Sequence, residues 1–441
     1  MKRRVGPTLS GRRAVALAGV ILAGAVATVH ADGLSAVAAL GRQMFFDPAL
    51  SASGAMSCAF CHDPANHYGP QPGVVVEQGG PGLDRPGIRT VPSIAYASLT
   101  PPFSIGPENA TSEAAEALPM QVAETTDTVP FSPATAITKL VIANQAPPAA
   151  KSGDTSGNMV ARGGLFWDGR AQTLQDQAEG PLLSPFEMAN ADIPTLAARL
   201  RAAYAKPLGR FFGDQILKDD RMTVDEAAYA LARFQMEDPS FHPFSSKYDA
   251  WLAGKATLTD AESRGRALFE DPKKGNCAAC HLDRPDATGK PPLFTDFEFE
   301  ALALPRNPAI PANGDPAHHD LGLCGPLRQD APQAANCGLF KTPTLRNVAT
   351  RSVFFHNGAY TTLTDAVEFY ALRDTDPARI YPRGPDGSVE VYNDLPPRYR
   401  GNIDRTDAPL NRHAGDPPAL TKAEVGDIVA FLNTLTDGWH P

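Results

Sequence analysis

The sequence predicts a mainly α protein built from two similar domains, each wrapped in long irregular loops. Three observations carry this prediction. The chain has 441 residues, which is more than one hydrophobic core usually holds. The motif Cys-x-x-Cys-His occurs at residues 58–62 and again at 277–281, each time after a similar lead-in. Between short helical segments the chain is rich in proline and glycine, with few of the alternating patterns of strands.

The N-terminal residues have the pattern of a secretory signal peptide. The basic residues of this region are Lys2, Arg3, Arg4, Arg12 and Arg13. They precede an apolar run over residues 14–26, after which Val29-His30-Ala31 offers a cleavage site. A membrane anchor is the alternative, but the run is shorter than the roughly 18 residues of a spanning helix. We therefore expect residues 1–31 to be removed on secretion through the inner membrane, which leaves a periplasmic protein without a membrane span.

Acidic residues outnumber basic ones. The chain has 49 aspartates and glutamates against 40 lysines and arginines, and loss of the basic leader makes the mature protein more acidic still. Proteins that bind nucleic acid carry basic faces. We therefore expect no nucleic-acid partner.

Both Cys-x-x-Cys-His motifs have the pattern of covalent haem attachment. They are Cys58-Ala59-Phe60-Cys61-His62 and Cys277-Ala278-Ala279-Cys280-His281. In this motif the two thiols add to vinyl groups of the porphyrin, and the histidine coordinates the iron. Zinc is the alternative, but a zinc ribbon places its cysteine pairs about 15–20 residues apart, and a thioredoxin-like motif would occur once. We expect two covalently bound haem c groups, with His62 on the first iron and His281 on the second.

The lead-ins form an internal repeat, which indicates a duplicated domain. They are Gly41-Arg42-Gln43-Met44-Phe45 and Gly265-Arg266-Ala267-Leu268-Phe269. We predict two cytochrome c-like haem domains with long irregular loops, an N-terminal one of residues 32–248 and a C-terminal one of residues 249–441. The boundary falls near residues 248–254.

Capping boxes predict the helix that closes each domain. Thr223-x-x-Glu226 opens an alanine-rich stretch that runs to about Met236, and Thr421-x-x-Glu424 opens one that ends near Leu435. The long loops between helices are unusual for an ordinary domain, but haem supplies apolar mass for them to pack on.

Cys324 and Cys337 lie outside both haem motifs. In an oxidising compartment a remaining pair most simply forms a disulfide. Two free thiols are the alternative.

Three further segments carry a family resemblance. They are Phe166-Trp167-Asp168-Gly169-Arg170, Phe340-Lys341-Thr342-Pro343-Thr344-Leu345-Arg346-Asn347-Val348 and Phe355-His356-Asn357-Gly358. With the two haem motifs, they make the chain resemble the bacterial dihaem cytochrome c peroxidase and MauG family over most of its mature length. The resemblance implies a peroxide-reacting N-terminal haem, a C-terminal haem that stores an oxidising equivalent, and a tryptophan between them. Trp167 matches that tryptophan, although a lone tryptophan is more often a core aromatic.

The resemblance also implies a distal pocket beside the first haem. Gln177, Pro181 and Glu187 fall at the family's distal positions. A carboxyl group near bound peroxide takes a proton from one oxygen and delivers it to the other, and Glu187 is the candidate for this role. A glutamate at such a position is otherwise a solvated helix residue or a cap.

The second iron needs a distal ligand, and methionine is excluded in the C-terminal domain because the last methionine is Met236. Within the family, the MauG-like branch uses tyrosine there, and Tyr370 stands at that position. A buried helix tyrosine is the alternative. Tyrosine is an anionic oxygen ligand, whereas a thioether raises the haem potential, so Tyr370 favours storage of an oxidising equivalent.

The first haem is expected to be five-coordinate and open to peroxide without prior reduction. Peroxidases of the family that accept electrons block this haem with a histidine from a later loop. Between Asp63 and Trp167 the only histidine is His67, which lies too close to His62 to match that ligand and is interpreted as a surface residue.

A calcium ion between the haems is a further family feature, but the chain departs from its pattern. Thr90 stands where the family has asparagine, while backbone carbonyls of Arg351 and Val353 remain available as oxygen ligands. MauG relays electrons through a tryptophan two residues before its second haem motif, where this chain has Gly275. The docking route of the partner is therefore expected to differ.

The sequence leaves three functions open for this protein. The first is a periplasmic dihaem c-type enzyme that uses hydrogen peroxide to form a high-valent, bis-Fe(IV)-like state and then oxidises residues, above all tryptophan, of a partner protein. The MauG-like branch includes MbnH, which resembles the chain in layout and modifies tryptophan on a copper-associated partner. The second is a dihaem cytochrome c peroxidase that reduces hydrogen peroxide with electrons from a small electron-donor protein. The third, a plain electron carrier, would need two closed haems.

Overall fold

The computed structural model describes residues 33–107, 159–286 and 288–441, so the expected signal peptide of residues 1–31 lies outside the described residues. The α-helices are α1 (Ala36–Phe45), α2 (Cys58–Cys61), α3 (Leu174–Leu183), α4 (Ile193–Phe212), α5 (Asp220–Glu237), α6 (Lys247–Leu252), α7 (Asp260–Glu270), α8 (Leu363–Leu372), α9 (Pro377–Ile380) and α10 (Lys422–Asn433). The strands are β1 (Gln78–Gly79), β2 (Arg85–Pro86), β3 (Ser104–Pro107), β4 (Met159–Arg162), β5 (Phe299–Glu300) and β6 (Phe340–Lys341).

The prediction of a mainly α fold is confirmed. In the described residues the strands form only antiparallel pairs, β1 with β2, β3 with β4 and β5 with β6. Within the described residues, the segments between these elements consist of short 3-10 helices, turns and irregular chain, as the proline-rich and glycine-rich composition indicates.

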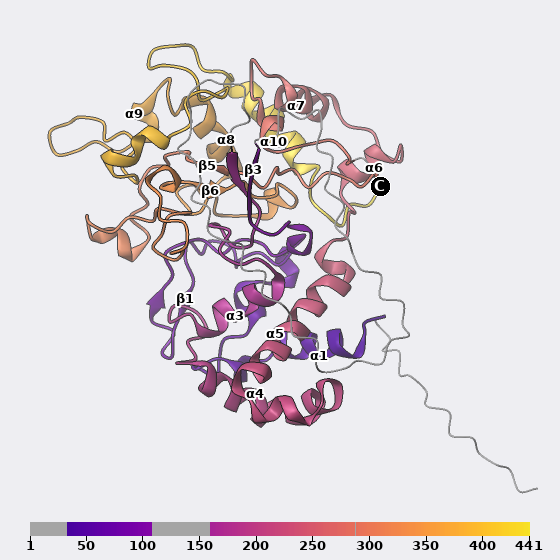
Figure 1. The fold of residues 1–441 in the computed structure, drawn as a ribbon. Helices are drawn as coiled ribbons and strands as arrows, with labels where there is room; N and C mark the ends of the chain where they lie inside the picture. Colours follow the sequence, from indigo (N-terminus) through magenta and orange to yellow (C-terminus); the bar gives the residue numbers. More distant parts are fainter. Residues whose placement is uncertain (1–32, 108–158, 287) are drawn as a thin grey trace, which may run out of the picture.

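The same helix arrangement occurs in both halves of the molecule. In the first half α1 and α3 pack against α5, and in the second half α7 and α8 pack against α10. Figure 1 shows the first set at the bottom and the second at the top. The internal repeat of the sequence therefore corresponds to a repeated three-helix unit.

The glycine of each lead-in lies where two helices cross. A Cβ on Gly41 would lie 1.8 Å from the Ala230 carbonyl oxygen of α5, and one on Gly265 would lie 1.9 Å from the Asp427 carbonyl oxygen of α10. No side chain fits at such a separation, so glycine is what allows the backbones to approach. The repeated glycine thus marks the same helix crossing in each half.

Two hydrophobic cores surround these crossings. Phe45 packs edge-on against Phe234 in the first core, with ring centroids 5.5 Å apart. Phe269 packs edge-on against Phe431 in the second, at 5.2 Å. Each pair joins the end of a lead-in to the last helix of its half, so the motif supplies both the close crossing and the aromatic residue beside it.

The predicted start of the last helix is right in one half and wrong in the other. Thr421 caps α10 in a capping box with Glu424, as predicted. In the first half Asp219, not Thr223, is the cap of α5. Thr223 is fully buried, and its hydroxyl donates to the Ile216 and Asp219 carbonyl oxygens. The earlier aspartate, a strong N-cap residue, begins the helix one turn sooner.

Chain from the first half reaches across to the second. The hairpin of β3 and β4 continues into a bridge between Arg162 and Glu298, next to β5. The Gly163 amide then donates to the Phe297 carbonyl oxygen at 2.9 Å. In Figure 1 the dark β3 accordingly lies among elements of the second half.

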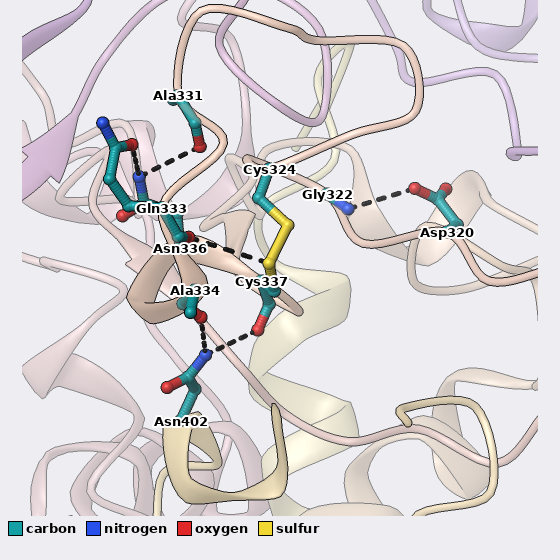
Figure 2. The surroundings of a disulfide bond; sticks show 9 residues. All are labelled: Asp320, Gly322, Cys324, Ala331, Gln333, Ala334, Asn336, Cys337 and Asn402. Carbon is teal, nitrogen blue, oxygen red and sulfur yellow. Dashed lines mark hydrogen bonds between the residues drawn. A yellow bond between two sulfur atoms is a disulfide. The ribbon is translucent and has the colours of Figure 1, made fainter. Parts of the chain in front are cut away.

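A disulfide joins Cys324 and Cys337 in the long loop between β5 and β6. Figure 2 shows the side-chain amide of Asn402 donating to the carbonyl oxygens of Ala334, at 2.7 Å, and Cys337, at 2.9 Å. The disulfide and these bonds tie the loop to itself and to the turn that contains Asn402. Within the described ranges, the structure contains no helix that is long and apolar enough to cross a membrane.

The crossing of α7 and α10 provides a stability test with a control on the partner helix. Gly265→Ala on α7 should lower the free energy of unfolding by about 1–3 kcal/mol, because the new methyl group overpacks a closed contact with α10. Gly426, on α10 itself, has nothing within 4 Å of a Cβ placed on it. Gly426→Ala should therefore be neutral or stabilising by up to about 1 kcal/mol. Urea unfolding followed by circular dichroism measures both, and equal effects would contradict this packing.

Candidate active site

A cavity between the two halves is lined by residues of both haem motifs. Of the residues singled out from the sequence, those that line it are Cys61, His62, Thr90, Trp167, Gln177, Pro181, Glu187, Cys277, Cys280, His281, Arg351 and Tyr370. Cys58 packs against the first hydrophobic core, and Val353 is completely buried. The structure therefore brings most of the predicted site together in one continuous space.

The first motif presents its histidine in a defined orientation. Cys58–Cys61 forms the single helical turn α2, which places residues three apart on one side. The Nδ1 of His62 is 3.2 Å from the Tyr68 carbonyl oxygen, to which it donates as the N–H tautomer. That bond leaves Nε2 as the nitrogen able to coordinate a metal. Burial lowers the pKa of His62 to about 4, which keeps the ring neutral.

The second motif repeats this arrangement. The Nδ1 of His281 is 2.9 Å from the Phe294 carbonyl oxygen, and burial lowers the pKa of His281 to about 4. Cys277 and Cys280 are not in a disulfide, and burial raises the pKa of the Cys277 thiol to about 12. Each half therefore offers a neutral imidazole with Nε2 left over, next to two free thiols. This donor set fits a porphyrin with an axial histidine.

A matching turn leads into the distal side of each half. Leu165 bridges to Ala171 in the first half, and Phe354 bridges to Tyr360 in the second. Phe166 and Phe355 both take the left-handed conformation, at φ 68° and 64°. Two of the three sequence segments that suggested the family therefore form equivalent turns, one in each half.

Each turn is followed by a ten-residue helix with a threonine cap, Thr173 for α3 and Thr362 for α8. The eighth residue of α3 is Pro181, and the eighth residue of α8 is Tyr370. Because the turns and caps coincide, these two residues occupy equivalent positions. A proline side chain has no atom that coordinates iron, whereas a tyrosine has one.

Tyr370 faces the cavity from α8, and its ring lies against Phe355 at a centroid distance of 5.9 Å. Burial raises the pKa of the Tyr370 phenol. In a site of this kind the phenolate forms only beside a cation, and a ferric iron is such a cation. The position thus fits a distal ligand better than a free acid or base.

Glu187 faces the cavity just after α3. Its backbone is held by β1 and the following residue, because the Gly80 amide donates to the Glu187 carbonyl oxygen at 2.8 Å. Burial raises the pKa of the Glu187 carboxyl, against the opposing effects of the Ser184 hydrogen bond and the charge of Arg170. A raised pKa suits a group that both takes and gives a proton near neutral pH.

Gln177 lies one turn before Pro181 on the cavity side of α3. Pro181 has no N–H, so it makes no helical hydrogen bond back to Gln177. The polar amide and the closed pyrrolidine ring therefore line the same wall of the cavity, near Glu187.

Trp167 is buried between the two halves. Its Nε1 donates to the Thr90 carbonyl oxygen at 2.9 Å. Its own carbonyl oxygen accepts from the Lys341 amide of β6, also at 2.9 Å. The indole is therefore fixed by one contact from the first half and one from the second.

A buried ion network follows Trp167. The Asp168 carboxylate, fully inaccessible to solvent, accepts from Arg89 at 2.7 Å and from Arg170 at 2.9 Å. Arg89 also binds Asp320 of the second half through two nitrogens, at 2.6 and 2.8 Å. Buried charges that are paired and hydrogen-bonded in this way define one geometry strongly.

The side-chain contacts of several site residues carried no sequence signal. Arg89 and Asp320 meet across 231 positions of the chain. Lys341 donates its Nζ to the Gly164 carbonyl oxygen, and burial lowers the pKa of Lys341 to about 8. Arg351 was expected to contribute a backbone carbonyl only, yet the residue lines the cavity and its guanidinium donates to two backbone carbonyl oxygens.

His67 departs from its interpretation as a surface residue. It is half-buried, takes a left-handed backbone conformation at φ 49° and lines the cavity. The reason is local: the Ser93 hydroxyl donates to the His67 carbonyl oxygen at 2.7 Å and holds this turn against the following loop.

The fold and the cavity define a haem-dependent oxidoreductase with two redox centres. The family model described as di-haem cytochrome c peroxidase matches residues 35–257. Similarity to MauG proteins, given below, extends the match over most of the chain. The chain therefore belongs to the dihaem cytochrome c peroxidase family and to its MauG-like branch, and haem is its cofactor.

Two relatives and one solved structure show the range of this similarity. The methylamine utilization protein MauG of Paracoccus denitrificans (strain Pd 1222) is 33% identical over 413 residues, which are 91% of this chain and 89% of that protein. The cytochrome c551 peroxidase of Nitrosomonas europaea is 29% identical over 281 residues, 62% of this chain and 61% of that protein. The diheme peroxidase BthA of Burkholderia thailandensis E264 is 37% identical, with a TM-score of 0.72 and coverage of 91% and 86%.

Proposed function

We propose that this protein uses hydrogen peroxide to oxidise residues, tryptophan above all, of a partner protein. The observation that carries the proposal is Tyr370, which stands on α8 at the position that Pro181 occupies on α3. At this position one half then offers an anionic ligand, and the other offers none. Such an unequal pair suits one haem that reacts with peroxide and a second that retains an oxidising equivalent.

The two haems have separate sets of proposed ligands. Cys58, Cys61 and His62 would hold the first haem, the cysteines through thioether bonds and the histidine through Nε2. Cys277, Cys280 and His281 would hold the second in the same way, with Tyr370 as its distal ligand. When bound, the haems supply the redox chemistry, which takes two oxidising equivalents from peroxide and passes them to the partner.

The division of the chain follows from these ligand sets. We propose residues 32–248 as the N-terminal c-type haem domain and residues 249–441 as the C-terminal one. The two hydrophobic cores support a division close to this boundary, because the first ends with Phe241 and the second begins with Tyr248, one residue before the proposed C-terminal domain. The Cys324–Cys337 disulfide is typical of an oxidising compartment, so we also propose that the signal peptide directs the protein to the periplasm.

Glu187 is proposed to handle the protons of peroxide. Its carboxylate accepts the proton of the peroxide oxygen that binds, and the resulting acid returns a proton to the oxygen that leaves as water. Gln177 offers an amide to orient the same molecule, and Pro181 leaves space without competing for the iron. The raised pKa of Glu187 allows both halves of this exchange.

Trp167 is proposed to carry electrons between the two redox centres. Support comes from its place in the wall of the cavity and from its two hydrogen bonds, one to each half. A rigid indole loses and regains an electron with little rearrangement of its surroundings. The partner residue loses two electrons in total, and peroxide gains two electrons and two protons to become water.

Glu187→Gln should slow the reaction with peroxide about 100-fold, the lower range for loss of a general base. The native rate should also fall as the pH drops through the raised pKa of Glu187, because only the carboxylate accepts the first proton, whereas the variant should lose this dependence. Stopped-flow absorbance at several pH values measures both. Glu179→Gln is the control, since Glu179 pairs with Arg221, and equal rates in native protein and Glu187→Gln would contradict the assignment.

The partner reaction tests the function itself. The native holoenzyme, given peroxide and the exported proteins of its own organism, should leave an oxidised tryptophan on one of them, detected by peptide mass spectrometry. Trp167→Phe should reduce that product at least tenfold, whereas Trp251→Phe, packed beside Tyr248 in the second core, should not. Steady peroxide turnover with a reduced small cytochrome and no modified protein would favour the electron-donor peroxidase instead.

A further inference from the structure

The side chain of Arg351 occupies the region between the halves where the family resemblance places calcium. Its Nε donates to the Val353 carbonyl oxygen, and its Nη2 donates to the Val91 carbonyl oxygen, both at 3.2 Å. Val353 contributes the carbonyl expected as a calcium ligand. The residue after Val91 is Pro92, whose backbone interacts with the ring of His62. The guanidinium therefore lies close to the proximal side of the first proposed haem.

Arg351 carries its charge without an acidic partner in the described part of the chain. No ion pair or opposing charge is found for it there, and a guanidinium is not deprotonated in proteins. At neutral pH the group therefore remains a cation. A guanidinium has five N–H donors, of which the two backbone carbonyls take only part, so the others are available to an anion in the cavity.

The surrounding oxygens do not fit calcium. Calcium takes six to eight oxygen ligands at about 2.3–2.6 Å. The Thr90 hydroxyl is used as a donor to the Phe355 carbonyl oxygen at 2.8 Å, and the Thr90 carbonyl oxygen accepts from Trp167. The Val353 carbonyl oxygen accepts from Arg351. Within the described residues, no group of three or more histidine, cysteine, aspartate or glutamate side chains could hold a metal ion.

We propose that the Arg351 guanidinium replaces the calcium ion as the fixed cation between the two haem sites. It joins the backbone of the second half, at Val353, to that of the first half, at Val91, as a shared metal ligand shell would. Its remaining N–H groups would bind an anionic group in the adjoining cavity, for which the carboxylates of the first haem are the matching chemistry. The inference rests on the proposed haem sites but not on the oxidation of a partner protein.

Calcium content and calcium dependence are the first test. The holoenzyme is equilibrated with excess calcium, dialysed against calcium-free buffer and assayed by mass spectrometry of metals. Its absorbance and electron paramagnetic resonance spectra are recorded before and after addition of a chelator. Calcium far below one ion per chain and unchanged spectra are expected. One retained ion per chain, or a spectral change that added calcium reverses, would overturn the proposal.

Substitution of Arg351 is the second test, read out as the reduction potential of each haem. Arg351→Met removes the charge, and loss of a nearby cation stabilises ferric over ferrous iron. The potential of the first haem should therefore shift to more negative values. Arg351→Lys should lie nearer to the native value, and Arg284→Gln, at an exposed arginine, should match it.

A first-haem potential in Arg351→Met equal to the native one would overturn the charge role. Neither readout uses peroxide or a partner protein. A result that contradicts the role of Arg351 is therefore distinguishable from one that contradicts the proposed oxidation of a partner protein. If Arg351→Met does not fold, the chelation experiment on the native holoenzyme still decides between arginine and calcium.

Discussion

The buried carboxylate of Asp168 holds the centre of the molecule together. It accepts hydrogen bonds from Arg89 and Arg170, and Arg89 also donates to the Asp320 carboxylate in the second half. Removing one member of such a buried set costs about 3–5 kcal/mol, because the remaining charges are left without partners. Trp167 immediately precedes this carboxylate, so its position depends on the same network. The position of the indole between the halves is thus coupled to this network of paired side chains.

A repeated scaffold with different residues at one key position accounts for the proposed difference in chemistry between the two halves. Both halves use a lead-in glycine at a helix crossing, a histidine whose Nδ1 donates to a backbone carbonyl, and a left-handed turn before a threonine-capped helix. They differ at the eighth residue of that helix, where one half has Pro181 and the other Tyr370. The proposed open and closed distal sides would therefore be built on one shared scaffold. The different roles proposed for the two haems depend on this one position in each helix.

Local patterns predicted much of this arrangement. The two haem motifs, the repeated lead-in and the capping box at Thr421 each depend on residues a few positions apart, which a sequence displays directly. The prediction at Thr223 was wrong because a stronger cap, Asp219, lies four residues earlier. The proline-rich and glycine-rich segments also predicted the loops correctly, because proline and glycine restrict or release the local backbone conformation.

Contacts between distant parts of the chain could not be predicted in the same way. The pairing of Arg89 with Asp320, and the reach of Arg351 to Val91, cross more than 200 residues. No local pattern distinguishes these arginines from those on the surface. The charges that define the interior of the site therefore emerge only from the fold, although the chemistry of the site was largely visible in its motifs.

The unequal distal sides are the central claim, and electron paramagnetic resonance of the resting ferric holoenzyme tests them most directly. The native protein should show one high-spin and one low-spin haem. Tyr370→Phe should alter the low-spin signal alone, while Tyr360→Phe, in the same aromatic cluster, should leave both signals unchanged. Two low-spin haems that are indifferent to Tyr370→Phe would contradict both the open first site and tyrosine ligation of the second.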